Sequence, residues 1–248
     1  MTEIAIIIPS RLGAKRLPNK PLKTINNKEM ILHVHDVAVE ANIGEVFVAT
    51  PDKEILQVVK EHGGRSIFTR SEHETGTDRI FEVFEKELKK KPKFVINLQG
   101  DMPNLNPLVI KDLINHMKKK TCDIGTLASS LKGEIEKKDS NVVKVITEKD
   151  IEKKEFSKAI DFFRLSQNLN VSPVYHHIGI YAFTNEALIR YVNLKRSKLE
   201  IQRKLEQLRA LDNEMKIEVG YVKQCPLSVD TEEDFKEIKK MMEVHDKN

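Results

Sequence analysis

Residues 4–22 read IAIIIPSRLGAKRLPNKPL and combine an apolar run with a cationic loop. Its first part, Ile4–Ile8, is a continuous apolar run, which is typical of a strand buried on both faces of a parallel sheet. The loop that follows carries four cations within ten residues and is longer than an ordinary strand-to-helix connection. Open α/β sheets bind ligands at the carboxyl ends of their strands, so we expect this loop to face a ligand.

The charge of this loop favours a polyphosphate. Arg11, Arg16 and Lys20 offer guanidinium and ammonium donors to phosphate oxygens, together with backbone N–H groups. The loop is neither a Walker A loop nor a G-x-G-x-x-G fingerprint, because it has neither glycine pattern. A basic surface loop is the alternative, but charge combined with position at a strand end favours phosphate binding.

Outward from this loop, apolar runs alternate with helical periods to about residue 120. The predicted strands are 46–49, 67–68 and 94–98. The predicted helices are 29–42, 55–59, 80–88 and 109–117, the second of them ended by Gly63 and Gly64. This alternation indicates βαβ units and a mainly parallel sheet flanked by helices.

The rhythm changes after about residue 122, where strand-like runs follow one another with fewer helices between them. These runs are 125–131, 142–146, 178–183 and 217–222. They predict an antiparallel extension of the parallel sheet. Because no Gly/Ser/Pro-rich linker separates the parts, we expect one domain, residues 1–248, with a smaller elaboration at about 126–222.

Composition excludes several classes of protein. The 248 residues are 40% hydrophobic and 32% charged, which suits a packed core and not a disordered chain. A net charge of +4 is too small for a nucleic-acid coat, and the lysine clusters 89–91 and 118–120 fall at predicted helix ends. The longest apolar run is too short for a membrane span, and the first residues do not resemble a secretory signal. Two cysteines make neither a disulfide framework nor a four-ligand zinc site, so a reduced cytoplasmic protein is expected.

Two acidic positions are candidate metal ligands. Asp101 follows the strand 94–98, and a hard cation such as Mg²⁺ is held by carboxylates together with substrate phosphates. A simple turn before Pro103 explains Asp101 equally well. Asp230 precedes the last helix, where Thr231 and Asp234 have capping-box spacing. From the residues alone, a helix cap is the favoured role of Asp230.

The histidines indicate no catalytic chemistry. His33 and His35 have ordinary helical spacing, and His176 and His177 precede an apolar strand. No H-E-x-x-H or G-x-S-x-G pattern supports a zinc protease or a serine hydrolase.

Six segments in one order along almost the whole chain carry a resemblance to a known family. They are IPSR with RLPNKPL (residues 8–22), TGTDR (75–79), QGDMP (99–103), HIGIY (177–181), LEQLR (205–209) and VDT (229–231). Together they resemble the 3-deoxy-manno-octulosonate (Kdo) cytidylyltransferases, also called CMP-Kdo synthetases. The resemblance implies a Rossmann-like α/β nucleotidyltransferase fold and a homodimer that makes CMP-Kdo from CTP and Kdo for lipopolysaccharide, with no nucleic-acid partner and no membrane insertion.

The resemblance also implies roles for individual residues. Arg11, Arg16 and Lys20 would hold the CTP phosphates and, with Asp101, form the catalytic set; Asp101 and Asp230 would ligate Mg²⁺. The implied nucleotide contacts are completed by Pro9, Arg70, Thr75 and Arg79. The implied Kdo contacts are Gln99, Arg164, His177, Glu206 and Gln207.

This sequence departs from the family pattern in two places. Met102 stands where the family commonly has Glu, which removes one carboxylate beside the expected metal. Residues 147–173 match poorly, and only Phe163 and Arg164 are similar to the family's aromatic-Ser-Arg segment.

The alternative functions are a CMP-sialic acid synthetase, a GT-A glycosyltransferase and a nucleotide-sensing module without turnover. The segments 177–181 and 205–209 favour Kdo over a sialic acid. A glycosyltransferase of this type would carry a D-x-D metal motif, whereas residues 99–103 contain a single Asp. A sensor without turnover is disfavoured because the charged site residues are retained, namely Arg11, Arg16, Lys20, Asp101 and Asp230.

Overall fold

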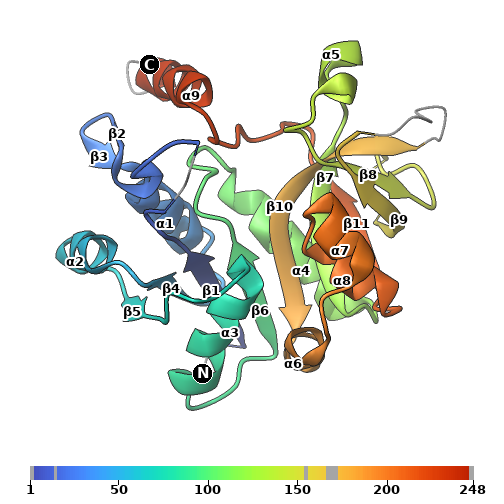
Figure 1. Ribbon diagram of the computed structural model, residues 1–248, viewed down its shortest axis with the longest axis horizontal. Helices are drawn as coiled ribbons and strands as arrows, with labels where there is room; N and C mark the ends of the chain where they lie inside the picture. Colours follow the sequence, from blue (N-terminus) through green and yellow to red (C-terminus); the bar gives the residue numbers. More distant parts are fainter. Residues whose placement is uncertain (1–2, 14–15, 154–155, 166–172, 246–248) are drawn as a thin grey trace. The chain divides into compact units, whose positions relative to one another are not determined.

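The computed structural model describes residues 3–13, 16–153, 156–165 and 173–245 (Figure 1). The chain divides into two compact units. One unit comprises Met1–Lys111 together with Pro226–Asn248, and the other comprises Asp112–Cys225. The C-terminal segment therefore belongs with the N-terminal half of the chain.

The first unit is built on four parallel strands in the order β5-β4-β1-β6 (Figure 1). The strands are β1 (Ile4–Pro9), β4 (Glu45–Thr50), β5 (Ser66–Phe68) and β6 (Phe94–Leu98). Every residue of β1 is buried, as the apolar run predicts. The chain winds outward from β1 through β4 to β5 and returns to the other side of β1 at β6. This is the doubly wound order, whose switch point lies between β1 and β6.

Helices follow these strands close to their predicted positions. They are α1 (Met30–Glu40), α2 (Lys53–Glu61) and α3 (Gly76–Lys86). The α2 helix ends where Gly63 adopts a φ of 82°, which favours glycine, so its predicted stop is confirmed. Lys91 donates to the carbonyls of Phe84 and Glu85 at 2.6 and 2.9 Å, so this lysine cluster interacts with a helix C-terminus.

A small apolar cluster joins the cationic loop to the last helix, α9 (Glu232–His245). After the loop come the 3₁₀ helix η1 (Lys20–Leu22) and a hairpin of β2 (Thr24–Ile25) and β3 (Lys28–Glu29). The buried members of the cluster are Leu17, Ile25, Met30, Val229, Phe235 and Ile238. Burial of these side chains brings the start of α9 to the cationic loop.

The second unit has five strands that pair in a closed circuit, β10-β7-β11-β9-β8, with β8 pairing again with β10. Among the described residues of this unit, β7 and β11 are the one pair that runs parallel. The strands are β7 (Ile124–Ser129), β8 (Lys144–Thr147), β9 (Ser157–Phe163), β10 (Val174–Thr184) and β11 (Ile217–Tyr221). The four predicted strands are present as β7, β8, β10 and β11, and the antiparallel pairings of β10, β8 and β9 confirm the predicted extension, although β7 and β11 pair with each other in parallel. The predicted mixed α/β fold is confirmed.

The helices of this part of the chain are mostly short. They are α4 (Pro107–Lys119, which contains the boundary between the units), α5 (Gly133–Lys138), α6 (Asn185–Asn193), α7 (Lys198–Arg203) and α8 (Gln207–Asp212). Of these helices, α4 was predicted and the others were not. A helix of six residues, such as α5, α7 or α8, is too short to repeat an apolar spacing, whereas the nine-residue α6 was simply missed. The strand β9 was not predicted either, since Lys158 and Ile160 both face outward and obscure its alternation.

Two further sequence expectations concern membranes and cysteines. Among the described residues, no helix combines the length and the apolar character that crossing a bilayer requires. Cys122 and Cys225 are free thiols, and burial raises the pKa of Cys122 to about 12.

Candidate active site

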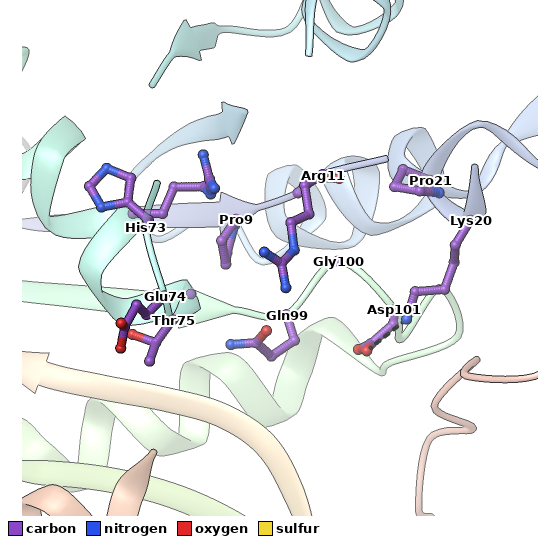
Figure 2. Close-up of a pocket in the computed structure, with 13 residues that line it drawn as sticks. Pro9, Arg11, Lys20, Pro21, His73, Glu74, Thr75, Gln99, Gly100 and Asp101 are labelled. Carbon is purple, nitrogen blue, oxygen red and sulfur yellow. Dashed lines mark hydrogen bonds and ion pairs between the residues drawn. The ribbon is translucent and has the colours of Figure 1, made fainter. Parts of the chain in front are cut away.

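A cavity of about 240 Å³ opens at the carboxyl ends of β1 and β6, at the switch point of the first unit (Figure 2). The N-terminus of α3 borders it as well, and the dipole of that helix favours anions. Its lining residues are Pro9, Ser10, Arg11, Lys20, Pro21, His73, Glu74, Thr75, Gly76, Arg79, Gln99, Gly100 and Asp101. Seven residues predicted from the sequence are therefore brought together here: Pro9, Arg11, Lys20, Thr75, Arg79, Gln99 and Asp101.

Lys20 lies among three oxygen atoms. Its Nζ is 3.2 Å from Asp101 Oδ2, 3.3 Å from Asp230 Oδ1 and 2.7 Å from the Val229 carbonyl. Figure 2 shows the Lys20 side chain extending toward Asp101. Burial alone would lower the pKa of Lys20, but the two carboxylates outweigh it and the pKa is raised. The two acidic groups thus face one position that holds a positive charge.

The helix cap and the acidic site are assigned to different residues. Asp234 N–H donates to Thr231 Oγ1 at 3.2 Å, and Thr231 N–H donates to Asp234 Oδ2 at 2.8 Å, which is the reciprocal pattern of a capping box. Asp230 is not needed as the cap. Its carboxylate instead pairs with Lys20 and with Arg16, whose Nη2 is 3.0 Å from Oδ2. Arg16 therefore reaches the site through Asp230, although it is not one of the cavity-lining residues.

Backbone hydrogen bonds position the acidic groups and the loop. Val229 N–H donates to the Asp101 carbonyl at 2.9 Å, which fixes the segment before α9 against the end of β6. Ser10 N–H donates to the Ala49 carbonyl at 2.9 Å, and Leu12 N–H donates to Asp52 Oδ2 at 2.8 Å. The start of the cationic loop is thus held beside β4.

The N-terminal turn of α3 is organised by Thr75 and Arg79. Thr75 Oγ1 accepts from the Asp78 N–H at 3.2 Å and caps the helix. Arg79 is only 3% exposed, and its Nη1 donates to Thr69 Oγ1 at 2.6 Å and to the Arg70 carbonyl at 2.9 Å. Burial lowers the pKa of Arg79. Arg70, also predicted as a nucleotide contact, has a 69% exposed side chain and does not line the cavity.

Glu82 of α3 supports the segment that precedes Thr75. It accepts from His73 Nε2, from the Arg70 N–H at 3.0 Å and from Lys86 Nζ at 2.9 Å. Burial alone would raise the pKa of Glu82, but these hydrogen bonds outweigh it and lower the pKa to about 2. The His73 ring is thereby fixed at the edge of the cavity.

The remaining predicted substrate contacts lie in the second unit. His177 is buried with Nε2 2.9 Å from Thr126 Oγ1, and burial lowers its pKa to about 3, so the imidazole is neutral. Arg164 Nη1 donates to the carbonyls of Ser140 and Asn141 at 3.1 and 2.9 Å. Gln207 is buried and Glu206 is half-buried, both at the start of α8.

A buried ion pair stabilises the turn that carries Glu206 and Gln207. Arg209 Nε and Nη2 donate to the two carboxylate oxygens of Glu200 at 2.9 and 2.8 Å, and both side chains are almost fully buried. The Arg209 guanidinium also lies 4.5 Å from the ring centre of Tyr191, whose hydroxyl donates to the Glu206 carbonyl at 2.9 Å. None of these three supporting residues was predicted.

The structure adds two observations, one on Ser10, which had no signal in the sequence, and one on Met102, which the sequence marked as a departure from the family pattern. Ser10 Oγ is buried and, among the described residues, has no hydrogen-bond partner, although Ser10 is one of the lining residues. Met102, which replaces a family Glu, is only 2% exposed and does not line the cavity. Its apolar side chain is therefore accommodated in the core.

The doubly wound sheet and the cationic cavity at its switch point are typical of α/β proteins that bind nucleotides. A family model described as Cytidylyltransferase matches residues 5–217. The chain belongs to this cytidylyltransferase family. It is 41% identical over 241 residues to the 3-deoxy-manno-octulosonate cytidylyltransferase of Bartonella tribocorum (strain CIP 105476 / IBS 506), covering 97% of this chain and 98% of that protein.

Other relatives agree with this membership. The 3-deoxy-manno-octulosonate cytidylyltransferase of Brucella ovis (strain ATCC 25840 / 63/290 / NCTC 10512) is 43% identical over 230 residues, which is 92% of this chain and 91% of that protein. A solved structure of CMP:2-keto-3-deoxy-manno-octonic acid synthetase complexed with CTP superimposes with a TM-score of 0.87 at 33% identity, covering 98% of this chain and 99% of that chain. The family resemblance identified from the sequence motifs is confirmed.

Proposed function

We propose that this protein transfers the cytidylyl group of CTP to the anomeric hydroxyl of Kdo, which yields CMP-Kdo and pyrophosphate. The observation that carries the proposal is the convergence of Asp101 and Asp230 on Lys20, which lines the switch-point cavity together with Asp101. The names of the relatives support CTP and Kdo as the substrates. In the reaction the anomeric oxygen attacks the α-phosphorus and loses its proton, and the bond to the pyrophosphate oxygen breaks.

The proposed role of the cationic loop is to bind the CTP phosphates. Arg11 lines the cavity, Lys20 lies at its acidic end, and Arg16 is held nearby by Asp230. Phosphoryl transfer mainly requires positioning and charge stabilisation, which these three cations supply. The residues proposed to border the nucleoside are Pro9, Thr75 and Arg79 in the cavity lining and Arg70 outside it.

A divalent cation, Mg²⁺, is proposed at the acidic end of the cavity. The donor set fits, because Asp101 Oδ2, Asp230 Oδ1 and the Val229 carbonyl all lie within 3.3 Å of one positively charged nitrogen, and all three are oxygen atoms. Asp101 and Asp230 would hold the ion, which would offset the charge of the phosphates when bound. Lys20 would then be released from the carboxylates to pair with the phosphate oxygens.

We propose acid-sugar contacts for each unit separately: Gln99 in the first unit, and Arg164, His177, Glu206 and Gln207 in the second. The second unit contains residues 126–222, to which we assign the substrate and dimer contacts within a single nucleotidyltransferase domain. The homodimer and the cytoplasmic location remain predictions. Light scattering of the purified chain measures the first, and cell fractionation the second.

The test of the proposed function is a pyrophosphate-release assay. The full-length protein is given each of the four ribonucleoside triphosphates against Kdo and a sialic acid, with and without Mg²⁺. We expect turnover with CTP and Kdo that requires Mg²⁺. Faster turnover with the sialic acid, or none with either acid sugar, would overturn the proposal.

A further inference from the structure

We propose that His35, Asp36 and His62 form a binding site for a divalent transition-metal ion of the Zn²⁺ type, separate from the nucleotide cavity. His35 and Asp36 belong to α1, and His62 directly follows α2. None of the three lines the cavity. The proposal is therefore independent of the reaction assigned above.

The three side chains converge on one oxygen atom. Asp36 Oδ1 is 3.2 Å from His35 Nδ1 and 2.9 Å from His62 Nε2, and the three candidate ligand atoms all lie within 4.8 Å of one another. Ligands of a tetrahedral Zn²⁺ with bonds of about 2.0–2.1 Å are separated by about 3.3 Å. Within the described segments, no other three His, Cys, Asp or Glu side chains converge in this way.

Neighbouring groups orient the three ligands. Lys28 Nζ binds Asp36 Oδ2, which leaves Oδ1 to face the two imidazoles. A side-chain carbon at Gly64 would lie 2.7 Å from His35 Nε2, so a glycine there allows this edge of the ring to pack closely while Nδ1 faces Asp36. Support of this kind behind the ligands is typical of metal sites.

The burial pattern gives the cluster a closed side and an open side. The His35 side chain is 9% exposed, whereas those of Asp36 and His62 are 29% and 34% exposed. An ion could reach the cluster from the solvent, and three protein ligands leave a fourth position for water. The ion would then join α1 to the end of α2.

The donor chemistry selects the class of metal. Two imidazole nitrogens and one carboxylate oxygen suit Zn²⁺, Cu²⁺ or Ni²⁺, whereas Mg²⁺ prefers oxygen ligands.

The experiment uses the tag-free, full-length protein, stripped of metal with a chelator. It is titrated with Co²⁺, followed by visible absorption, and with Zn²⁺, followed by the melting temperature and by metal analysis after desalting. With millimolar Mg²⁺ present throughout to occupy the proposed oxygen-donor site at Asp101 and Asp230, we expect one Co²⁺ or Zn²⁺ ion per chain, a melting temperature that rises with Zn²⁺, and no displacement of the bound Co²⁺ by further Mg²⁺. The His62→Ala variant lacks one proposed ligand, so its affinity for Zn²⁺ should be about tenfold to a hundredfold weaker.

Matched variants separate a metal site from a metal-free network of ion pairs. Asp36→Asn is the second ligand variant and should also lose affinity. His33→Ala is the control, because His33 lies on the same helix but its Nε2 contacts the Ile25 carbonyl instead of the cluster. Circular dichroism checks that each variant is folded. Absence of binding by the unmodified chain, displacement by Mg²⁺, or equal affinity in folded His62→Ala would overturn the proposal.

Discussion

Lys20 and Asp230 are 210 positions apart in the sequence, yet Lys20 Nζ lies 3.3 Å from Asp230 Oδ1. The same ammonium group also contacts Asp101. One cation therefore joins the cationic loop, the end of β6 and the start of α9. The site depends on the return of the C-terminal segment to the first unit, and substitutions at these positions test its proposed chemistry.

Replacing Arg16 by Ala is expected to impair the use of CTP. A charge-assisted hydrogen bond contributes about 1.5–3 kcal/mol, which corresponds to a decrease in kcat/KM for CTP of roughly ten- to a hundredfold. Steady-state kinetics at varied CTP concentrations measure this decrease in kcat/KM. Arg65→Ala is the control, because Arg65 is also exposed and paired with a carboxylate, Glu45, but does not line the cavity. Equal kcat/KM values for the two variants would contradict the phosphate role of Arg16.

Asp101→Asn and Asp230→Asn are each expected to reduce kcat strongly while the protein stays folded. Asn preserves the shape of the side chain but removes the negative charge that a hard cation requires. Kinetics at increasing Mg²⁺ should show partial rescue of each variant. Because both residues would serve one ion, the double variant should lose little more activity than either single variant. Fully additive losses would tell against a shared ion.

The helix cap provides a control for the Asp230 variant. Thr231→Ala removes the capping oxygen and should cost about 1 kcal/mol of stability. Its kcat should remain close to normal, since Asp230 is retained. Urea denaturation and the pyrophosphate assay together distinguish the two adjacent residues. A loss of activity in Thr231→Ala as large as that in Asp230→Asn would mean that the integrity of the cap, and not the Asp230 charge, is what the reaction needs.

Glu82 is expected to make stability depend on acid pH. Its pKa is about 2 in the folded protein, below its ordinary value of 4.5. The stabilisation is therefore fully present above about pH 4.5 and is lost as the pH falls toward 2. Denaturation across this range should show a shallower decline for Glu82→Gln, which should also be less stable at pH 7. Glu85→Gln, at an exposed position of the same helix, should retain the original pH dependence.

Arg209→Met is expected to destabilise the second unit by about 3–5 kcal/mol. The substitution leaves the carboxylate of Glu200 buried without its bidentate partner. Calorimetry or urea denaturation measures the loss. Arg196→Ala should cost far less, because the Arg196 side chain, which donates from Nε to Glu200 Oε1 at 2.9 Å, is 39% exposed, whereas that of Arg209 is 3% exposed. Equal losses in the two variants would contradict the buried pair as the main support of this turn.

Much of the fold could be predicted because its signals are local. The apolar run at Ile4–Ile8 and the helical periods up to α4 depend on neighbours a few positions away, and the structure places strands and helices there. The second unit was harder to predict. Its helices α7 and α8 have only six residues each, and the buried pair between Glu200 and Arg209 has no periodic pattern in the sequence.

Local patterns in the sequence were sufficient to predict the βαβ units, the cationic loop at a strand end and the order of motifs that marks the family. The role of Asp230, by contrast, depends on the tertiary structure. Local spacing favours a helix cap, but Thr231 fills that role, and Asp230 meets Lys20 because Phe235 and Ile238 pack with Leu17 and Ile25. A cap depends on contacts three residues apart, whereas this ion pair forms only when burial of apolar side chains brings distant segments together.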